Sequence, residues 1–187
     1  MEPSFVRVTF TDQELREIMQ LAEARQTSKR AAGLVNQRID MRRSPVEVEF
    51  VGILGEAAVG KYLGIGYDRA IRLTGRRGRQ RVTHRVPGLF TLQVNYTRLS
   101  KFILNEVKDF QADYGILVVE TAFSPQEVKI AGYIARAVFA TNCRYENLGY
   151  GPRFTIGVDK LRPVSEIAAL IPAPAKMPQP EQLGLFR

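Results

Sequence analysis

Residues 114–119 read Tyr-Gly-Ile-Leu-Val-Val, a continuous run without a charged side chain. A run of this kind is typical of a central strand that is covered on both faces of its sheet. Residues 128–134, Val-Lys-Ile-Ala-Gly-Tyr-Ile, follow after Ser124-Pro125, a dipeptide that favours a turn. The two runs therefore predict a buried strand and its neighbour at the centre of a sheet.

Two helices are predicted upstream of this sheet. Thr11 and Glu14 have the spacing of a capping box, and apolar residues at helical spacing behind them predict a first helix from about Asp12 to the low 30s. A second helix is predicted to begin at Pro45, because the fixed φ of proline suits a first helical turn. Gly64 is expected to end it.

The remaining elements are shorter. We expect strands over 71–73, 81–86, 89–96 and 154–158, and helices over 135–141 and 164–170. In 89–96, Leu92 and Val94 alternate with Gln93 and Asn95. This order of elements predicts an α/β (α+β) domain with a central mixed sheet flanked by helices.

Composition limits the class of protein. The chain has 187 residues, 45% of them hydrophobic and 25% charged, which fits one globular domain. It has neither an apolar run of membrane-spanning length nor a signal-peptide pattern, so we expect no membrane partner and a cytoplasmic, nucleoid-associated location. A single cysteine, Cys143, excludes an internal disulfide and a cysteine zinc cluster, and a single histidine, His84, excludes most histidine-based metal sites.

The positive charge is concentrated in one region. The net charge is +8, and residues 57–105 alone carry +9 because ten basic residues there face one acid, Asp68. The rest of the chain sums to −1. Within this region, residues 75–81 read Gly-Arg-Arg-Gly-Arg-Gln-Arg, so arginines alternate with residues that leave the backbone adaptable.

Arginine makes planar, bidentate contacts with phosphate, and several such contacts produce salt-sensitive binding to nucleic acid. Nucleic acid is therefore the expected partner, with a solvated arginine-rich loop or an acidic protein surface as the alternatives. The candidate DNA-binding residues are Arg69, Arg72, Arg76, Arg77, Arg79, Arg81, Arg85, Arg98 and Lys101.

Four stretches resemble the PD-(D/E)xK nuclease fold, and in particular a phage and bacterial branch of it. They cover about residues 48 to 165, and they are 52–64 (Gly-Ile-Leu-Gly-Glu-Ala-Ala-Val-Gly-Lys-Tyr-Leu-Gly), 111–119, 130–134 and 160–164. In that family, a glutamate on the first helix supports a magnesium or manganese site. The resemblance places Glu56 in that role.

The other positions depart from the family pattern. Where the resemblance implies a carboxylate and a lysine on one strand, the sequence has Gln93 and Asn95, and the metal-binding aspartate falls at or near His84. A carboxamide binds magnesium far more weakly than a carboxylate. The resemblance therefore implies a nuclease scaffold that has lost its metal and kept its DNA surface, so we expect no cofactor.

Three other readings of these residues stay open. Asp68 could stand beside Glu56 and rebuild a magnesium or manganese site, or it could be a turn residue that pairs with an arginine. His84 could be a general base, although the sequence offers no orienting partner, or a partly buried strand histidine. Cys143 lacks a recognisable base and is expected to be inert.

The last residues form a separate unit. Residues 172–180 place proline at nearly alternate positions, which favours an extended, semi-rigid spacer. Behind it, 182–186 (Gln-Leu-Gly-Leu-Phe) resembles the pentapeptide that docks bacterial proteins on the DNA polymerase sliding clamp. The resemblance gives the contacts to Gln182, Leu183, Leu185 and Phe186, with Gly184 as the departure; the alternative is a tail that packs on its own domain.

The sequence thus predicts a basic nuclease-like domain over 1–171 and a linker with a docking peptide over 172–187. The expected function is that of a DNA-binding, clamp-associated accessory protein in replication or repair, with a pseudonuclease scaffold. One alternative is an active metal-dependent deoxyribonuclease. Another is a phage-encoded inhibitor of host replication or defence complexes. The sequence leaves the oligomeric state open.

Overall fold

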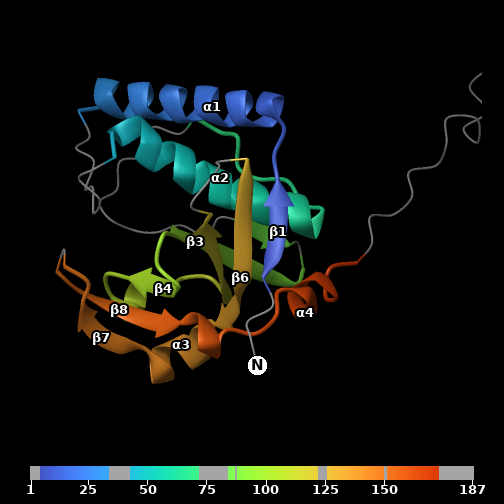
Figure 1. The fold of residues 1–187 in the computed structure, drawn as a ribbon, viewed down its shortest axis with the longest axis vertical. Coiled ribbons are helices and arrows are strands. Elements are labelled where there is room, and N and C mark those ends of the chain that lie inside the picture. Colours follow the sequence, from blue (N-terminus) through green and yellow to red (C-terminus); the bar gives the residue numbers. More distant parts are fainter. Residues whose placement is uncertain are drawn as a thin grey trace, which may run out of the picture.

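The computed structural model describes residues 5–33, 43–71, 84–86, 88–121, 126–149 and 151–172. Its elements form an α+β fold with one mixed sheet, one smaller antiparallel sheet and four α-helices (Figure 1). In chain order they are β1 (Val6–Thr9), α1 (Asp12–Ala31), α2 (Pro45–Leu63), β2 (His84–Val86), β3 (Phe90–Thr97), β4 (Lys101–Leu104), η1 (Val107–Asp109), β5 (Tyr114–Glu120), β6 (Glu127–Ala135), α3 (Arg136–Asn142), β7 (Arg144–Asn147), β8 (Pro152–Gly157), η2 (Val158–Lys160) and α4 (Ser165–Ala168).

Helix α1 begins at the predicted capping box. The Thr11 hydroxyl accepts a hydrogen bond from the Glu14 backbone N–H at 3.2 Å, and the Glu14 carboxylate accepts one from the Thr11 N–H at 2.7 Å. Two of the backbone donors that every helix start leaves unpaired are satisfied in this way. Ile18 and Ala22 are buried against the core, while the opposite side of α1 faces solvent.

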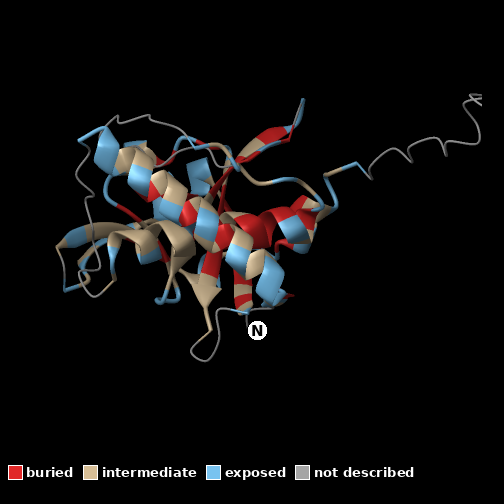
Figure 2. Cartoon of the chain, turned by 90° about the horizontal axis from the view of Figure 1, so that it is seen from above, coloured by how far each residue is buried: buried red, intermediate tan, exposed pale blue. Residues whose placement is uncertain are grey.

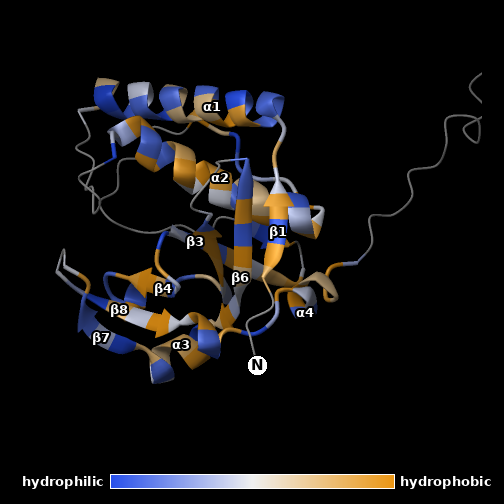
Figure 3. Ribbon diagram, in the orientation of Figure 1, coloured by the Kyte–Doolittle hydropathy of each residue, from blue (hydrophilic) through white to orange (hydrophobic). Residues whose placement is uncertain are grey.

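Helix α2 has a second capping box, from Ser44 and Glu47, with Pro45 in its first turn. It ends as predicted at Gly64, whose φ of +67° is a left-handed conformation that glycine adopts without a steric penalty. Figure 2 shows α2 almost wholly buried, in contrast to the striped α1, and Figure 3 shows the same contrast in hydropathy. Helix α2 therefore lies between α1 and the main sheet.

The main sheet has the order β1-β6-β5-β3-β2. Strand β5 is its centre, runs parallel to β3, and is antiparallel to β6. Residues Ile116, Leu117 and Val118 of β5 are fully buried. The prediction of a buried central strand at 114–119, with 128–134 as its neighbour, is confirmed.

A second sheet, of order β4-β8-β7, covers the face of the main sheet that is remote from α2 (Figure 1). It encloses a separate apolar core, in which the rings of Phe102, Phe110 and Phe139 contact one another at centroid distances of 5.4–5.6 Å. The predicted elements at 135–141 and 154–158 are observed as α3 and β8. Strands β1, β4 and β7 were not predicted.

The C-terminal part of the domain is held by a backbone bridge between Tyr133 and Arg162. Helix α4 follows, shorter than the predicted 164–170, and its Ile167 is buried in the first core. Ile171 packs on the same core, close to the last described residue. The linker and docking peptide, from residue 173 onward, lie outside the described residues.

Some other expectations also fall outside the description. They include the turn at 124–125 and parts of the strands predicted over 71–73 and 81–86; only Ile71 and the strand β2 are described there. Among the helices that are described, none is long and apolar enough to cross a membrane.

Candidate functional site

The cations of the described framework are mostly paired with carboxylates. Four ion pairs involve basic residues of the 57–105 region: Lys61–Glu14 at 2.7 Å, Arg69–Glu17 at 3.7 Å, Arg98–Glu120 at 2.9 Å and Lys101–Glu146 at 2.7 Å. Arg85, on edge strand β2, is exposed and has no carboxylate within ion-pair distance among the described residues. Three of the four described candidate DNA-binding residues thus already have an anionic neighbour.

The remaining candidates belong to residues 72–83, named here the basic segment. It contains Arg72, Arg76, Arg77, Arg79 and Arg81 and has no acidic residue. The segment itself lies outside the described residues, but both of its ends are described, at Ile71 and at His84. The site can therefore be built from its base.

The incoming end of the basic segment is held by Arg25 of α1. Its Nη2 donates to the Asp68 carbonyl at 2.6 Å, and its Nε donates to the Ala70 carbonyl at 3.2 Å. The Asp68 carboxylate accepts a hydrogen bond from the Ala70 N–H at 2.9 Å, which closes a local turn. Asp68 thus acts as a turn residue, one of the two roles considered for it.

The outgoing end is held by His84. This side chain is only 5% exposed, and its Nδ1 lies 3.0 Å from the Gly66 carbonyl. Burial lowers the pKa of His84, against the opposite influence of the Gly66 and Glu56 backbone and of the Asp68 carboxylate. A neutral imidazole can donate from Nδ1 to a carbonyl, whereas Nε2 is buried without a hydrogen-bond partner among the described residues.

Beneath this base lies the carboxyl group of Glu56, on α2. Burial raises the pKa of Glu56 to about 7; the Arg25 guanidinium acts in the opposite direction and the Asp68 carboxylate in the same direction. Glu56, Asp68, His84 and Arg25 are therefore within electrostatic reach of one another. The structure brings together the surviving family position, its possible replacement and one of the degenerate positions.

The other two degenerate positions lie elsewhere. The Gln93 Oε1 accepts a hydrogen bond from the Gln111 N–H at 3.3 Å, and the Asn95 Nδ2 donates to the Ile103 carbonyl at 2.8 Å. Both contacts are on the side of the second core, whereas the alternate residues Val94 and Tyr96 pack against α2. Gln93 and Asn95 therefore face away from Glu56, across the sheet.

The described residues do not fit a magnesium or manganese site. No group of three or more His, Cys, Asp or Glu side chains in the described ranges could hold a metal ion. Magnesium prefers six oxygen ligands, but here Arg25 stands beside two carboxyl groups, one of which has a raised pKa. Residues 72–83 bring no further carboxylate to this place, as their sequence shows.

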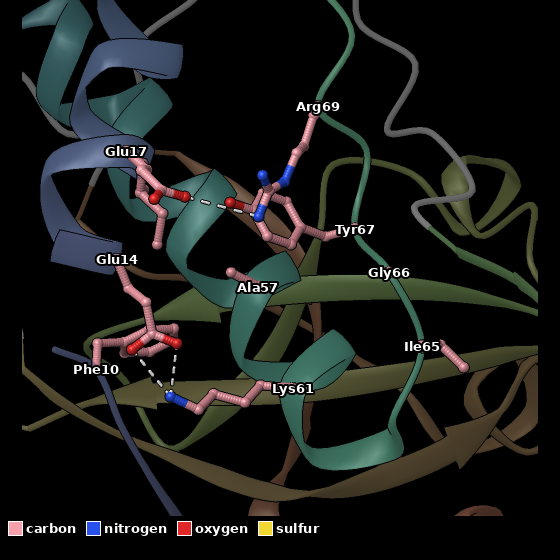
Figure 4. A pocket seen from close by; sticks show the side chains of 10 residues that line it. Phe10, Glu14, Glu17, Ala57, Lys61, Ile65, Gly66, Tyr67 and Arg69 are labelled. Carbon is pink, nitrogen blue, oxygen red and sulfur yellow. Dashed lines mark hydrogen bonds and ion pairs between the residues drawn. The ribbon is translucent and has the colours of Figure 1, made fainter. Parts of the chain in front are cut away.

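A groove of ≈ 230 Å³ beside the base lies between α1, the end of α2 and residues 65–69 (Figure 4). Two of the ion pairs, Lys61–Glu14 and Arg69–Glu17, cross it. The Lys61 ammonium also lies 5.3 Å from the centre of the Phe10 ring, and the Arg69 guanidinium 5.0 Å from that of Tyr67. These contacts join α1 to the run that leads into the basic segment.

Sequence reasoning missed Arg25. Its partners are two backbone carbonyls more than forty residues away, so no side-chain motif marks it. Gln182, Leu183, Leu185 and Phe186 all belong to the undescribed tail. No family model, curated protein or solved structure was found to match the chain.

Proposed function

We propose that this chain is a DNA-binding, sliding-clamp-associated accessory protein of replication or repair, on a nuclease-like scaffold without metal-dependent cleavage. The observation that carries the proposal is the contrast between two sets of cations. Those of the described framework mostly have carboxylate neighbours, whereas the five arginines of the basic segment have no acidic residue within the segment. Unneutralised arginines are the ones best able to replace the counterions of phosphates.

The nuclease-like part of the proposal rests on the sequence resemblance and on the position of Glu56. The loss of cleavage is supported by the carboxamides at 93 and 95, which are engaged in backbone contacts away from Glu56. It is supported further by the poor fit of the described donors to magnesium. A metal-free scaffold that keeps its basic segment can still bind DNA.

The clamp part of the proposal rests on the tail sequence. Leu185 and Phe186 would supply an apolar anchor, and the Gln182 carboxamide would supply directional hydrogen bonds. A short peptide binds weakly because it must become ordered. Its link to a DNA-binding domain gives an effective concentration on the order of millimolar for short flexible linkers, so neither contact has to be strong.

DNA binding is tested by fluorescence anisotropy on duplex and branched DNA at several salt concentrations. Replacement of Arg76, Arg77, Arg79 and Arg81 by Ala should weaken binding and reduce the slope of log K against log salt by about 3 to 4, since each phosphate contact contributes about 0.9. The matched control removes four exposed cations around the second sheet, namely Lys108, Arg136, Arg144 and Lys160. Equal losses in the two variants would contradict a role of the basic segment.

Clamp binding is tested by pull-down and surface plasmon resonance with purified bacterial sliding clamp. Removal of residues 182–187 should abolish the complex, and so should alanine at Gln182, Leu185 and Phe186 in the full chain. Alanine at Glu181, just before the motif, is the control and should bind as the wild type does. A complex of full strength without the last six residues would refute the clamp assignment.

The closeness of Glu56 and Asp68 favours one alternative, a magnesium- or manganese-dependent nuclease. It predicts metal-dependent DNA cleavage that disappears in both Glu56→Ala and Asp68→Ala. The proposed function predicts no such cleavage in the wild type. A reconstituted replication assay then distinguishes recruitment to the clamp from its inhibition.

A further inference from the structure

The basic segment begins and ends at one place in the fold. Its incoming side is the run 65–70 beside α2, and its outgoing side is β2, the edge strand that pairs with β3. His84 joins the two sides directly, through Nδ1 and the Gly66 carbonyl at 3.0 Å. The twelve residues from 72 to 83 are therefore closed at their base by a contact between the residues that flank them.

Arg25 fixes the same base from α1. A guanidinium that donates to two carbonyls two residues apart holds that peptide segment in one orientation, because its donors are coplanar. A lysine at this position would keep the charge and lose the two-point contact. Helix α1 is itself joined to α2 through the Lys61 ammonium and the Glu14 carboxylate, so Arg25 stands on a firm support.

Burial strengthens the contact made by His84. An imidazole that is 95% removed from solvent, with a lowered pKa, stays neutral and donates one hydrogen bond from Nδ1. The neighbouring Glu56 carboxyl is also buried, so few waters can compete for the Gly66 carbonyl. The base is thus a dry contact between α2, the run 65–70 and β2.

We propose that Arg25 and His84 are positioning residues for DNA binding: they fix both ends of the basic segment, so that its arginines meet phosphates from a common, immobile base. This inference rests on the proposed function, because it assigns the role of these residues toward the same partner. Fixing the ends during folding reduces the entropy that DNA binding would otherwise cost. Arg25 acts here through its two carbonyl contacts, and its own charge is secondary.

The test compares Arg25→Lys and Arg25→Gln with Arg30→Gln. Arg30 is exposed in the last turn of the same helix, and its replacement removes the same charge. Both Arg25 variants should bind duplex DNA about tenfold more weakly, the equivalent of one or two immobilised side chains, whereas Arg30→Gln should lose about threefold at most. In Arg25→Lys the salt slope should stay at the wild-type value, because the same phosphates are contacted.

Hydrogen–deuterium exchange of the free protein gives a readout that does not depend on DNA. Arg25→Lys and His84→Ala should raise exchange in peptides covering 66–86 and leave α1 and β5 unchanged. Wild-type DNA affinity in Arg25→Lys, or exchange that is raised uniformly across the domain, would overturn the inference. If the wild-type protein fails to bind DNA while the local exchange pattern holds, the proposed function fails and the base remains a structural feature only.

Discussion

The two faces of strand β3 have different surroundings, although they belong to one run of eight residues. Leu92, Val94 and Tyr96 pack against α2, close to Glu56 and the base of the basic segment. Gln93 and Asn95 face the second core, where Gln93 is fully buried and Asn95 is 7% exposed. The face with polar side chains is therefore as well covered as the apolar one.

The difference shows that a polar residue in a strand does not by itself mark a functional surface. Each of the two carboxamides has a backbone partner supplied by a neighbouring segment, Gln111 or Ile103. A buried carboxamide with such a partner is a stable element of a core. On the other face, the group that burial leaves without compensation is the Glu56 carboxyl.

The largest effect should come from restoring the nuclease pattern on β3. The double change Gln93→Glu and Asn95→Lys would bury two charges and remove the donor to the Ile103 carbonyl, at a cost of several kcal/mol in the free energy of unfolding. Urea denaturation measures this loss, and a plasmid assay with magnesium should show no cleavage. The control adds the same charges at exposed turn positions, Leu89→Glu and Leu99→Lys. Cleavage by the β3 variant would show that this face forms the site.

The next effect concerns Glu56, on the α2 side of β3. Its pKa rises from 4.5 to about 7 on folding, so the folded state holds this proton more tightly than the unfolded state. Its contribution to stability is fully present below pH 4.5 and is lost as the pH rises to about 7, an overall loss of about 3 kcal/mol. Glu56→Gln should remove this decline and be more stable than the wild type above pH 7.

Urea midpoints between pH 5 and pH 8 measure the Glu56 effect. Glu23→Gln removes an exposed carboxylate of α1 and should keep the wild-type decline. A Glu56→Gln variant with the same pH profile as the wild type would mean that the carboxyl group reaches solvent.

The smallest effect compares the packing on the two faces. A Cβ at Gly115, the β5 residue opposite Gln93, would lie 2.5 Å from Phe102 and 2.8 Å from Phe110. A Cβ at Gly55 of α2 would lie 3.2 Å from Tyr96. Gly115→Ala should therefore cost about 1–3 kcal/mol, whereas in Gly55→Ala the gain in helix propensity offsets part of the strain. Urea denaturation of the two variants checks the order, and a larger loss for Gly55→Ala would reverse the comparison.

Much of the fold could be predicted because its signals are local. The two capping boxes, the proline at the start of α2 and the glycine at its end are patterns within four residues. The apolar run of β5 is equally local. Strands β1, β4 and β7, of four residues each, were missed because so short a strand is stabilised by the partner with which it pairs.

The candidate site was predictable only in its parts. Glu56, Asp68 and His84 were singled out by their chemical types, but their meeting depends on how α2 packs against the edge of the sheet. The predicted grouping of Gln93 and Asn95 with them remains a matter of resemblance. Arg25 carried no signal, because its acceptors are backbone carbonyls.

The sequence by itself determined the helices, the central strand, the concentration of positive charge in 57–105 and the candidate docking motif, since each is a property of neighbouring residues. The tertiary structure alone decided which cations are neutralised, because their carboxylate partners come from distant elements. It also decided which face of β3 meets Glu56, since either face of an alternating strand can be covered. Burial then set the protonation of Glu56, because desolvation depends on everything packed around a carboxyl group and not on its neighbours in the chain.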